Sequence, residues 1–513
     1  MSATVRMSLP AFVEALLTPA AYPHAVTPPI QLLQTHISYV FLTGEYAYKV
    51  KKPVDFGFLN FTTLEKRQFY CQEELRLNQR LAPDLYLAVV PIVAVGDRYW
   101  VADSENLPAG AEVIDYAVQM RQFDQSQLLS HLFAANQVTP SLIESLGKAL
   151  AHFHRTAATS PHISEFGSPR AIAQVINNCH ALAAPFVGRC QSPEQYAAIQ
   201  AFTDDFLTRH QEWFVQRQAG GKIRECHGDL HLNNICLYDG RVQIFDCIEF
   251  NEEFRNIDGI YDAAFLLMDL EFRGRGDLAN LFLNTYLEWS GDYEGAVLLP
   301  LYLCVRAYIR GNVNALALND PAISEAEKAQ IQATAAAYYE AAYRYTQPRQ
   351  AKLYVMCGLS GAGKSTRGRG LAQAEQAIQI RSDAVRKHLA GLPLDRRSSD
   401  FPEVALYSEA MTQKTYDQIL AYAELLLRQG QTVILDAKYD RGALRQPVIA
   451  LAEKLHVPLE IHFCSAPPEE LRRRLSDRQG DIAEATPDLI AAQMASFESF
   501  LPEEEPYVRH VCD

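Results

Sequence analysis

The chain has 513 residues, and this length predicts about three domain-sized units. Hydrophobic residues make up 48% and charged residues 21%, which is close to the globular average and excludes disordered, fibrous and membrane classes. The net charge of -14 disfavours a protein whose main task is to grip nucleic-acid backbones. Without a long apolar run we expect a cytoplasmic protein, and the ten scattered cysteines, which form no C-x-x-C pair, indicate neither a zinc site nor a disulfide framework.

The first third of the chain predicts a small α+β lobe. Its one helical stretch covers Thr63–Ala82, has apolar residues at helical spacing and can be capped by Thr62 or Thr63. Short runs typical of strands surround it, at residues 36–44, 45–52, 85–95 and 98–104.

From about residue 126 to 346 the pattern becomes mainly helical. A strand-rich island at residues 226–250 interrupts it, which predicts a helical lobe with one β-hairpin. A polar stretch with a proline at residues 345–352 then marks a domain boundary. We therefore expect a domain at 1–346, with a small lobe at about 1–120 and a helical lobe at about 121–346, and a second domain at 352–513.

The second domain alternates strands and helices. Apolar strand-like runs occur at residues 353–359, 377–383, 432–437 and 459–465, and each is followed by a helical stretch. Such alternation predicts an α/β domain with a parallel sheet covered on both faces.

The stretch GLSGAGKST, which runs from Gly358 to Thr366, matches the phosphate-binding loop pattern G-x-x-x-x-G-K-[ST] between a predicted strand and a predicted helix. Glycines let successive backbone N–H groups converge on phosphate oxygens, Lys364 adds a positive charge, and Ser365 offers a hydroxyl to Mg²⁺. Asp436 ends the strand at 432–437 and can order the magnesium-bound water. The predicted ATP-binding residues are Gly358, Ser360, Gly361, Ala362, Gly363, Lys364, Ser365 and Thr366.

Asp383 ends the second strand of this domain, where a carboxylate can accept a proton from a substrate hydroxyl. Arg386 follows one helical turn later and can hold substrate. Arg474 and Arg478 are spaced to share a helix face and to close over a transferring phosphate. The plainer alternatives are a helix N-cap at Asp383 and a solvated basic helix face.

These motifs resemble the small P-loop kinases, which include polynucleotide 5′-hydroxyl kinase, gluconate kinase, chloramphenicol phosphotransferase and the zeta toxins. The resemblance covers residues 352–513 and implies a P-loop NTPase fold, with Asp383 as general base, Arg386 on the substrate side and Arg474 and Arg478 as catalytic lid arginines.

A second constellation lies in CHGDLHLNNICL and QIFDCIEF. Asp229 can orient or deprotonate a nucleophile, and Asn234 and Asp246 can supply oxygen ligands to a metal ion. A hairpin turn at Asp239-Gly240 would bring Asp246 back beside the other two.

This constellation resembles the aminoglycoside and choline phosphotransferase branch of the bilobal kinase-like fold. The resemblance implies a catalytic loop at residues 227–234 with a catalytic Asp229, Mg²⁺ ligands at Asn234 and Asp246, and an Asp262 that braces this loop. It also implies a lysine and glutamate pair in the small lobe.

Lys49 is our choice for that lysine, as a catalytic and ATP-binding residue, and Lys51 is its rival on the same strand face. Glu74 is our choice for the partner, with Glu73 as competitor. Thr35 and Ser38 stand where a glycine-rich loop is expected, so we expect Ser38 to contact ATP through its hydroxyl. The letters Asp55-Phe56-Gly57 precede Glu74 and lie far upstream of the catalytic loop, so we interpret them as a connector.

The whole chain resembles a bacterial fusion of these two kinase types. The resemblance implies a bifunctional ATP-dependent phosphotransferase that uses ATP and Mg²⁺ to phosphorylate hydroxyl groups of small molecules, such as sugars, nucleosides or aminoglycoside-like compounds. Alternatives are a 5′-hydroxyl polynucleotide kinase, a nucleotide-sensing regulator with one non-catalytic domain, and a protein kinase. The acidic balance counts against nucleic acid. Four acidic residues hint at a cationic or polyhydroxyl acceptor, with a solvated acidic loop as the alternative: Glu249, Glu252, Glu253 and Asp258.

Overall fold

The computed structural model describes residues 9–512 except 104–106, 108, 322 and 479. The chain divides into two compact units. One takes in the chain up to Val138 together with Ala157–Gly167 and Gly221–Asp262, and the other takes in Thr139–Thr156, Ser168–Gly220 and the chain from Ala263 onward. Among the described residues, no helix is both long and apolar enough to cross a bilayer.

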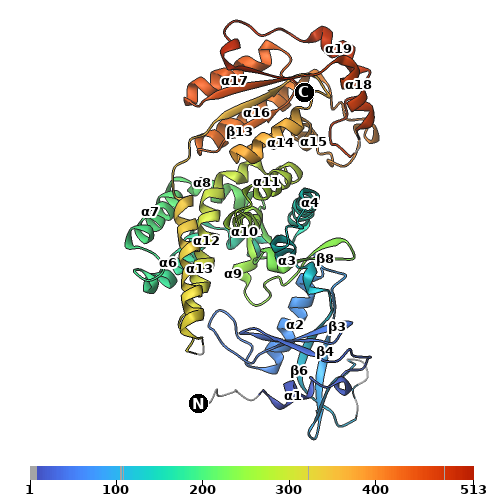
Figure 1. Cartoon of the computed structure of the whole chain (residues 1–513), viewed down its shortest axis with the longest axis vertical. Coiled ribbons are helices and arrows are strands. Elements are labelled where there is room, and N and C mark those ends of the chain that lie inside the picture. Colours follow the sequence, from blue (N-terminus) through green and yellow to red (C-terminus); the bar gives the residue numbers. More distant parts are fainter. Residues whose placement is uncertain (1–8, 104–106, 108, 322, 479, 513) are drawn as a thin grey trace. The chain divides into compact units, whose positions relative to one another are not determined.

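The first unit is built on a six-stranded antiparallel sheet with strand order β1-β2-β3-β6-β4-β5. Helix α2 (Leu64–Asn78) is capped by Thr63 and packs against β4 and β6 (Figure 1), so the predicted helix and its cap are confirmed. The strands are β1 (Gln31–Gln34), β2 (Ser38–Leu42), β3 (Tyr46–Lys51), β4 (Tyr86–Val95), β5 (Arg98–Val101) and β6 (Glu112–Arg121).

The rest of the first unit carries the catalytic-loop region. The predicted hairpin is present as β8 (Ile235–Tyr238) paired with β9 (Arg241–Ile244). Asp239 and Gly240 both have positive φ, at 48° and 73°, as a two-residue hairpin turn requires. Shorter elements complete the unit: α1 (Ala11–Ala15), α3 (Leu129–Ala134), α5 (Pro161–Glu165), β7 (Ile223–Glu225), α9 (Glu252–Arg255), β10 (Asn256–Asp258) and the start of α10 (Gly259–Phe272).

The second unit contains a group of helices followed by an α/β domain. The two helices predicted most clearly are present as α4 (Pro140–Thr156) and α13 (Glu325–Tyr345). The other helices of the group are α6 (Pro169–Ala183), α7 (Pro193–Arg209), α8 (Gln211–Ala219), α11 (Gly276–Ser290) and α12 (Leu299–Ala317). The kinase-like α+β class and the parallel sheet after it are thus both confirmed.

The sheet of the second unit has five parallel strands in the order β12-β13-β11-β14-β15. Helices α14 (Lys364–Glu375) and α16 (Glu409–Arg428) both contact β13 (Figure 1). The strands are β11 (Leu353–Cys357), β12 (Ile378–Arg381), β13 (Val433–Asp436), β14 (Leu459–Ser465) and β15 (Val508–Cys512). The remaining helices are α15 (Ser382–Leu389), α17 (Gly442–Leu455), α18 (Pro468–Asp477) and α19 (Leu489–Ser496). Sequence reasoning missed β15.

A buried ion pair fixes the chain just before β15. Arg445 on α17 and Glu504 are almost completely buried, and Nη2 of Arg445 lies 2.9 Å from Oε2 of Glu504. Arg445 also donates to the backbone carbonyls of Tyr439, Glu498 and Ser499. The guanidinium therefore ties the last strand segment to α17.

Replacing Glu504 with Ala should lower the free energy of unfolding by about 3–5 kcal/mol, because the buried Arg445 would lose its counter-charge. Urea unfolding of the full chain, followed by far-UV circular dichroism, measures the change. The matched control is Glu505→Ala, which alters the exposed neighbour and should stay within about 0.5 kcal/mol of the parent. Equal stability of the two variants would contradict this account.

Candidate active sites

Lys49 lies at the centre of the site in the first unit. It extends from β3, opposite Val40 and Val118 of the neighbouring strands, and its Nζ lies 2.8 Å from Glu74 and 2.6 Å from Asp246. Burial opposes the charge on Lys49, but the carboxylates of Asp246 and Glu74 outweigh burial and raise its pKa well above the ordinary value. Glu73, the competing glutamate, instead pairs with Arg76 on its own helix.

A second lysine shares the same glutamate. Lys51 is 1% exposed, and its Nζ lies 2.6 Å from the other oxygen of Glu74 and also contacts Glu249. Burial opposes this charge too, yet Glu249 and Glu74 raise the pKa of Lys51. Two lysines thus face three carboxylates, and Glu74 is held from both sides.

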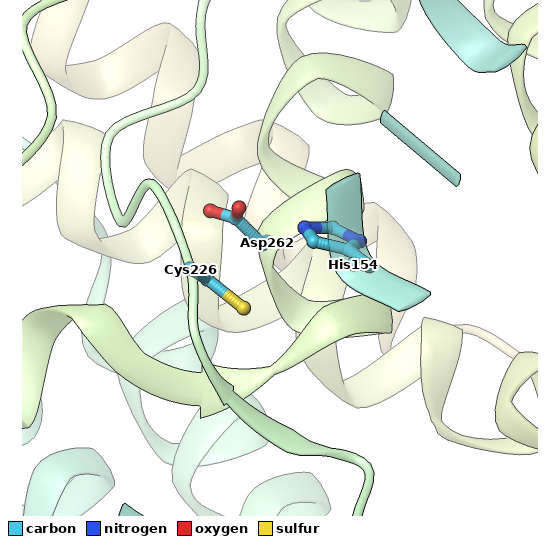
Figure 2. A group of neighbouring side chains, drawn as sticks. All are labelled: His154, Cys226 and Asp262. Carbon is cyan, nitrogen blue, oxygen red and sulfur yellow. The ribbon is translucent and has the colours of Figure 1, made fainter. Parts of the chain in front are cut away.

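The predicted catalytic loop is braced by Asp262 near the start of α10. The carboxylate of Asp262 accepts the backbone N–H groups of His227 and Gly228, at 3.0 and 2.9 Å. Cys226, labelled beside it in Figure 2, is buried, and this burial raises the pKa of its thiol. Gly228 has a φ of 88°, and a Cβ there would lie 2.6 Å from the carbonyl oxygen of Phe254, so only glycine fits.

His227 fixes its own tautomer. Its Nε2 lies 2.8 Å from the carbonyl oxygen of Phe245 and must donate a proton to it, and this leaves Nδ1 to accept the backbone N–H of Asp229 at 3.3 Å. Burial lowers the pKa of His227, so the ring stays neutral. His227 therefore positions the backbone of Asp229 and is not itself a proton shuttle.

Asp229, Asn234 and Asp246 form the polar end of this site. The side-chain amide nitrogen of Asn234 donates to Oδ2 of Asp229 at 3.1 Å and to its backbone oxygen at 3.0 Å. Asp246 has the unusual φ of 63°, and its backbone N–H donates to the hydroxyl of Tyr86. Its carboxylate contacts Lys49 and is still 44% exposed.

These residues fit a divalent cation. Because Asn234 uses its amide nitrogen for Asp229, its amide oxygen is the atom it can offer to a metal ion. Asp246 adds a partly exposed carboxylate, and hard cations prefer such oxygen ligands.

Two sequence motifs of the small lobe have purely local partners. Asp55 accepts the backbone N–H of Gly57 at 2.9 Å and the side-chain amide of Asn60 at 2.5 Å, which makes this segment a turn, as the connector interpretation predicted. In the turn between β1 and β2, Oγ1 of Thr35 accepts the backbone N–H of Ser38, and Ser38 is 1% exposed. A phosphate contact through the Ser38 hydroxyl would require this turn to open.

The suggestion that four acidic residues face the acceptor is wrong for two of them. Glu249 and Asp258 are each 4% exposed. Glu249 pairs with Lys51, and Asp258 accepts the backbone N–H of Ile260 at the start of α10. Burial makes these two carboxylates part of the scaffold and not of an acceptor-facing surface.

The phosphate loop of the second unit connects β11 to α14. Its glycines Gly358, Gly361 and Gly363 have φ values of 133°, 81° and 86°, and a Cβ on Gly358 would collide with the carbonyl oxygen of Cys464. Lys364 opens α14, and its Nζ donates to the carbonyl oxygen of Leu359 at 2.8 Å. Burial lowers the pKa of Lys364, and Asp436 and Asp383 oppose that shift.

Gln379 on β12 joins the two residues predicted to hold the metal ion here. Its side-chain amide nitrogen donates to Oδ2 of Asp436 at 3.0 Å and to the backbone oxygen of Ser365 at 3.3 Å. Asp436 ends β13 and is 4% exposed. Gln379 thus joins the Asp436 carboxylate to the backbone of Ser365, and the carboxylate and hydroxyl oxygens of these two residues are ligands of the kind that hard cations prefer. Sequence reasoning missed Gln379, although its place two residues before Arg381 on an apolar strand was a signal.

Asp383 lies in the first turn of α15, where burial raises its pKa and the guanidinium of Arg381 opposes the rise. Arg386 is 7% exposed and donates to the carbonyl oxygen of Leu406 and to the hydroxyl of Thr412, both at 3.1 Å. Arg386, which lies three residues after Asp383, is therefore held by hydrogen bonds within the P-loop domain.

The two predicted lid arginines, Arg474 and Arg478, differ in their position relative to helix α18. Nη1 of Arg474 lies 3.5 Å from the carbonyl oxygen of Gly361, so this side chain reaches the phosphate loop from α18. Helix α18 ends at Asp477, and Arg478 is the extended residue after it, with φ of -65° and ψ of 123°. The prediction that Arg474 and Arg478 share a helix face is therefore wrong.

Comparison with known proteins defines the class. Residues 66–299 match the model of the Phosphotransferase enzyme family, and residues 353–500 match an AAA domain model. These matches identify an ATP-dependent phosphotransferase that acts on hydroxyl groups. Enzymes with such domains typically use a divalent metal ion together with ATP. The matches confirm the predicted fusion of a phosphotransferase region with a P-loop kinase region.

The chain belongs to a family that includes a protein of Mycobacterium tuberculosis strain H37Rv described as uncharacterized protein Rv2004c. The two are 31% identical over 475 residues, which cover 93% of this chain and 91% of the relative. The uncharacterized protein Mb2027c of Mycobacterium bovis matches with the same identity and coverage.

Solved structures give weaker matches. An amicoumacin kinase, hAmiN, is 14% identical with a TM-score of 0.40, and the match covers 64% of this chain and 93% of that one. A gluconokinase from Sinorhizobium meliloti 1021 is 22% identical with a TM-score of 0.23, and it covers 32% of this chain and 83% of that one.

The two lysines of the first site should differ in what their removal does to stability. Lys51→Met should lower the free energy of unfolding by about 3–5 kcal/mol, because it leaves Glu249 buried without a cation. Lys49→Met should cost less, because Glu74 keeps Lys51 and Asp246 can turn to water. Urea unfolding measures both, with the exposed Lys66→Met as the matched control. A Lys51→Met chain as stable as the control would refute this assignment.

Proposed function

We propose that the chain is a bifunctional ATP-dependent phosphotransferase that moves the γ-phosphate of ATP to hydroxyl groups of small molecules, with one site in each unit. The observation that supports the proposal is that two separate groups of the predicted site residues are connected by ion pairs and hydrogen bonds. One set joins Lys49, Glu74 and Asp246 to Asp229 and Asn234. The other joins the phosphate loop and Lys364 to Ser365, Asp436 and Asp383.

In the first site, Asp229 is the proposed base that takes the proton from the acceptor hydroxyl as the phosphorus–oxygen bond forms. Its side chain is 35% exposed, and Asn234 and His231 hold its Oδ2. Lys49 is the proposed phosphate ligand, and Glu74 fixes its position. A Mg²⁺ ion held by Asn234 and Asp246 would neutralise charge on the phosphates.

In the second site, Lys364 is the proposed ligand of the ATP phosphates and Arg474 the proposed lid residue. Lys364 donates to a carbonyl of the phosphate loop and Arg474 contacts another carbonyl of the same loop, which supports a role for both cations in phosphate binding. Asp383 is the proposed base, Arg386 a proposed acceptor contact and Arg478 a second lid cation. Mg²⁺ would be held by Ser365 and Asp436.

The proposed acceptors are small polyhydroxyl compounds, such as sugars, nucleosides or aminoglycoside-like molecules. A net charge of -14 supports a small acceptor over a nucleic acid, whose backbone would be repelled. Both proposed bases are carboxylates, and carboxylates can deprotonate or orient a hydroxyl as it attacks phosphorus.

The test separates the two sites. Wild-type protein, Asp229→Ala, Lys364→Ala and the double variant are each incubated with ATP and a metabolite extract, and phosphorylated products are identified by mass spectrometry. Each single variant should lose its own product and keep the other, and the double variant should lose both, because each change removes one proposed base or phosphate ligand. If Asp229→Ala and Lys364→Ala each leave all products unchanged, the proposal fails. Loss of a single common product in both variants would overturn bifunctionality.

The second site should also show a defined pH dependence. Because burial raises the pKa of Asp383, and a base acts only when deprotonated, turnover in the Asp229→Ala chain should rise with pH through a midpoint above the usual aspartate range. The measurement is kcat/KM for ATP against pH, with Asp383→Asn as the comparison. Asp383→Asn should lower the rate by roughly 100-fold or more, since general-base catalysis contributes at least that much. A variant with the parent's rate and profile would exclude Asp383 as the base.

A further inference from the structure

Helix α11 covers the open edge of the P-loop domain's sheet. Strand β12 is the first strand in the sheet order, so its outer edge has no strand partner among the described residues. Two asparagines of α11, Asn280 and Asn284, donate to the carbonyl oxygen of Ala377 at 2.9 and 3.0 Å, and Asn284 also accepts the backbone N–H of Gln379 at 2.7 Å. The helix thus satisfies backbone groups that a strand edge would otherwise leave unpaired.

The same helix reaches the site through Glu288. Its Oε1 lies 2.9 Å from Nη1 of Arg381, and both side chains are largely buried. Arg381 ends β12, two residues before Asp383. Its other nitrogens lie 2.6 Å from Asp481, in the segment after α18, and 3.8 Å from Asp436. A single guanidinium therefore links α11, the segment after the lid helix and the proposed metal ligand.

Further contacts hold Glu288 in this place. The Nε2 atom of His388 on α15 lies 2.7 Å from the backbone oxygen of Glu288. The next residue, Trp289, packs against a cluster of three buried side chains: Ala384, Leu394 and Ile482. Because backbone and side chain are both fixed, Glu288 presents its carboxylate to Arg381 in one geometry.

We propose that Glu288 is a positioning residue for the P-loop site, which it serves by orienting Arg381. The proposal rests on the proposed function of that site. It is unexpected from the family matches, because Glu288 lies in the region of the Phosphotransferase enzyme family and Arg381 lies in the AAA domain region. Without Glu288 the guanidinium keeps its ion pairs with Asp481 and Asp436, and we expect it to shift toward them and away from its present place beside Asp383.

The chain offers a matched control for this role. Glu144 on α4 forms a similar ion pair with Arg369 on α14, at 3.0 Å, but both side chains are more exposed than Glu288 and Arg381. Arg381 interacts with Asp436, Asp383 and Asp481, whereas the salt bridge that Arg369 forms among the described residues is with Glu144. Glu144→Gln thus breaks an ion pair between the same two parts of this unit and changes neither Glu288 nor Arg381.

The experiment uses the full-length chain with Asp229→Ala as background, so that ADP formation from Mg²⁺–ATP reports the P-loop site. Glu288→Gln should lower kcat roughly 10-fold, the usual effect of removing a partner that orients a ligand. The dissociation constant of a non-hydrolysable ATP analogue, from calorimetry, should stay within about 2-fold of the parent, since the phosphate loop is intact. Glu144→Gln should leave both quantities unchanged.

Two further variants distinguish a role of Glu288 in positioning Arg381 from a role in the folding of the chain. If Glu288 acts through Arg381, then Glu288→Gln combined with Arg381→Gln should be no slower than Arg381→Gln alone, whereas independent effects would multiply. Glu288→Asp keeps the charge and should recover part of kcat. The proposal is overturned if Glu288→Gln matches Glu144→Gln, if the two effects multiply, or if Glu288→Asp is as slow as Glu288→Gln.

The result that would refute the proposed function differs from the result that would refute the positioning role of Glu288. In the same background, Lys364→Ala must abolish ADP formation if the P-loop site turns over ATP. Residual turnover in that variant would refute the site's proposed activity. A Lys364-dependent activity that does not respond to Glu288→Gln would refute only the positioning role.

Discussion

A carboxylate removed from water must be matched by a cation, and this constraint organises the first site. Glu74 is completely buried and could not remain charged with a single exposed partner. It is held by Lys49 on one oxygen and by Lys51 on the other, and Lys51 in turn neutralises Glu249. Lys49 belongs to the same network, because its ammonium pairs with both Glu74 and Asp246.

The order of the motifs along the chain predicted many of the residues that lie close together in the two candidate sites. The hairpin at Asp239-Gly240 had to return the chain beside the catalytic loop, and Asp246 does lie within reach of Lys49. Glu74 and Glu73 were harder to separate, since neighbours on a helix differ only by about 100° of rotation. The structure resolves them, because Glu73 turns to Arg76.

Other features depend on contacts that no local pattern encodes. Lys51 and Glu249 are 198 residues apart, and nothing near either residue indicates the other. Their burial turned an apparent acidic surface into scaffold. Strand β15 is a short run with two adjacent polar residues, Arg509 and His510, and its partner β14 supplies the pairing that makes it a strand. The left-handed backbone of Asp246 is likewise set by its surroundings, since a non-glycine residue rarely adopts that φ alone.

The domain boundary predicted at residues 346–352 follows composition, whereas the contacts of α11 follow the unpaired edge of a sheet. A polar linker indicates where the chain can be flexible, but it does not indicate where the hydrogen bonds of a strand are satisfied. Asn280, Asn284 and Glu288 lie far before that linker, and they bond to Ala377, Gln379 and Arg381 beyond it. A P-loop domain cut at the linker would keep its phosphate loop and lose the partners of its edge strand. For this chain, the unit that assembles the second site therefore begins well before the motif that identifies it.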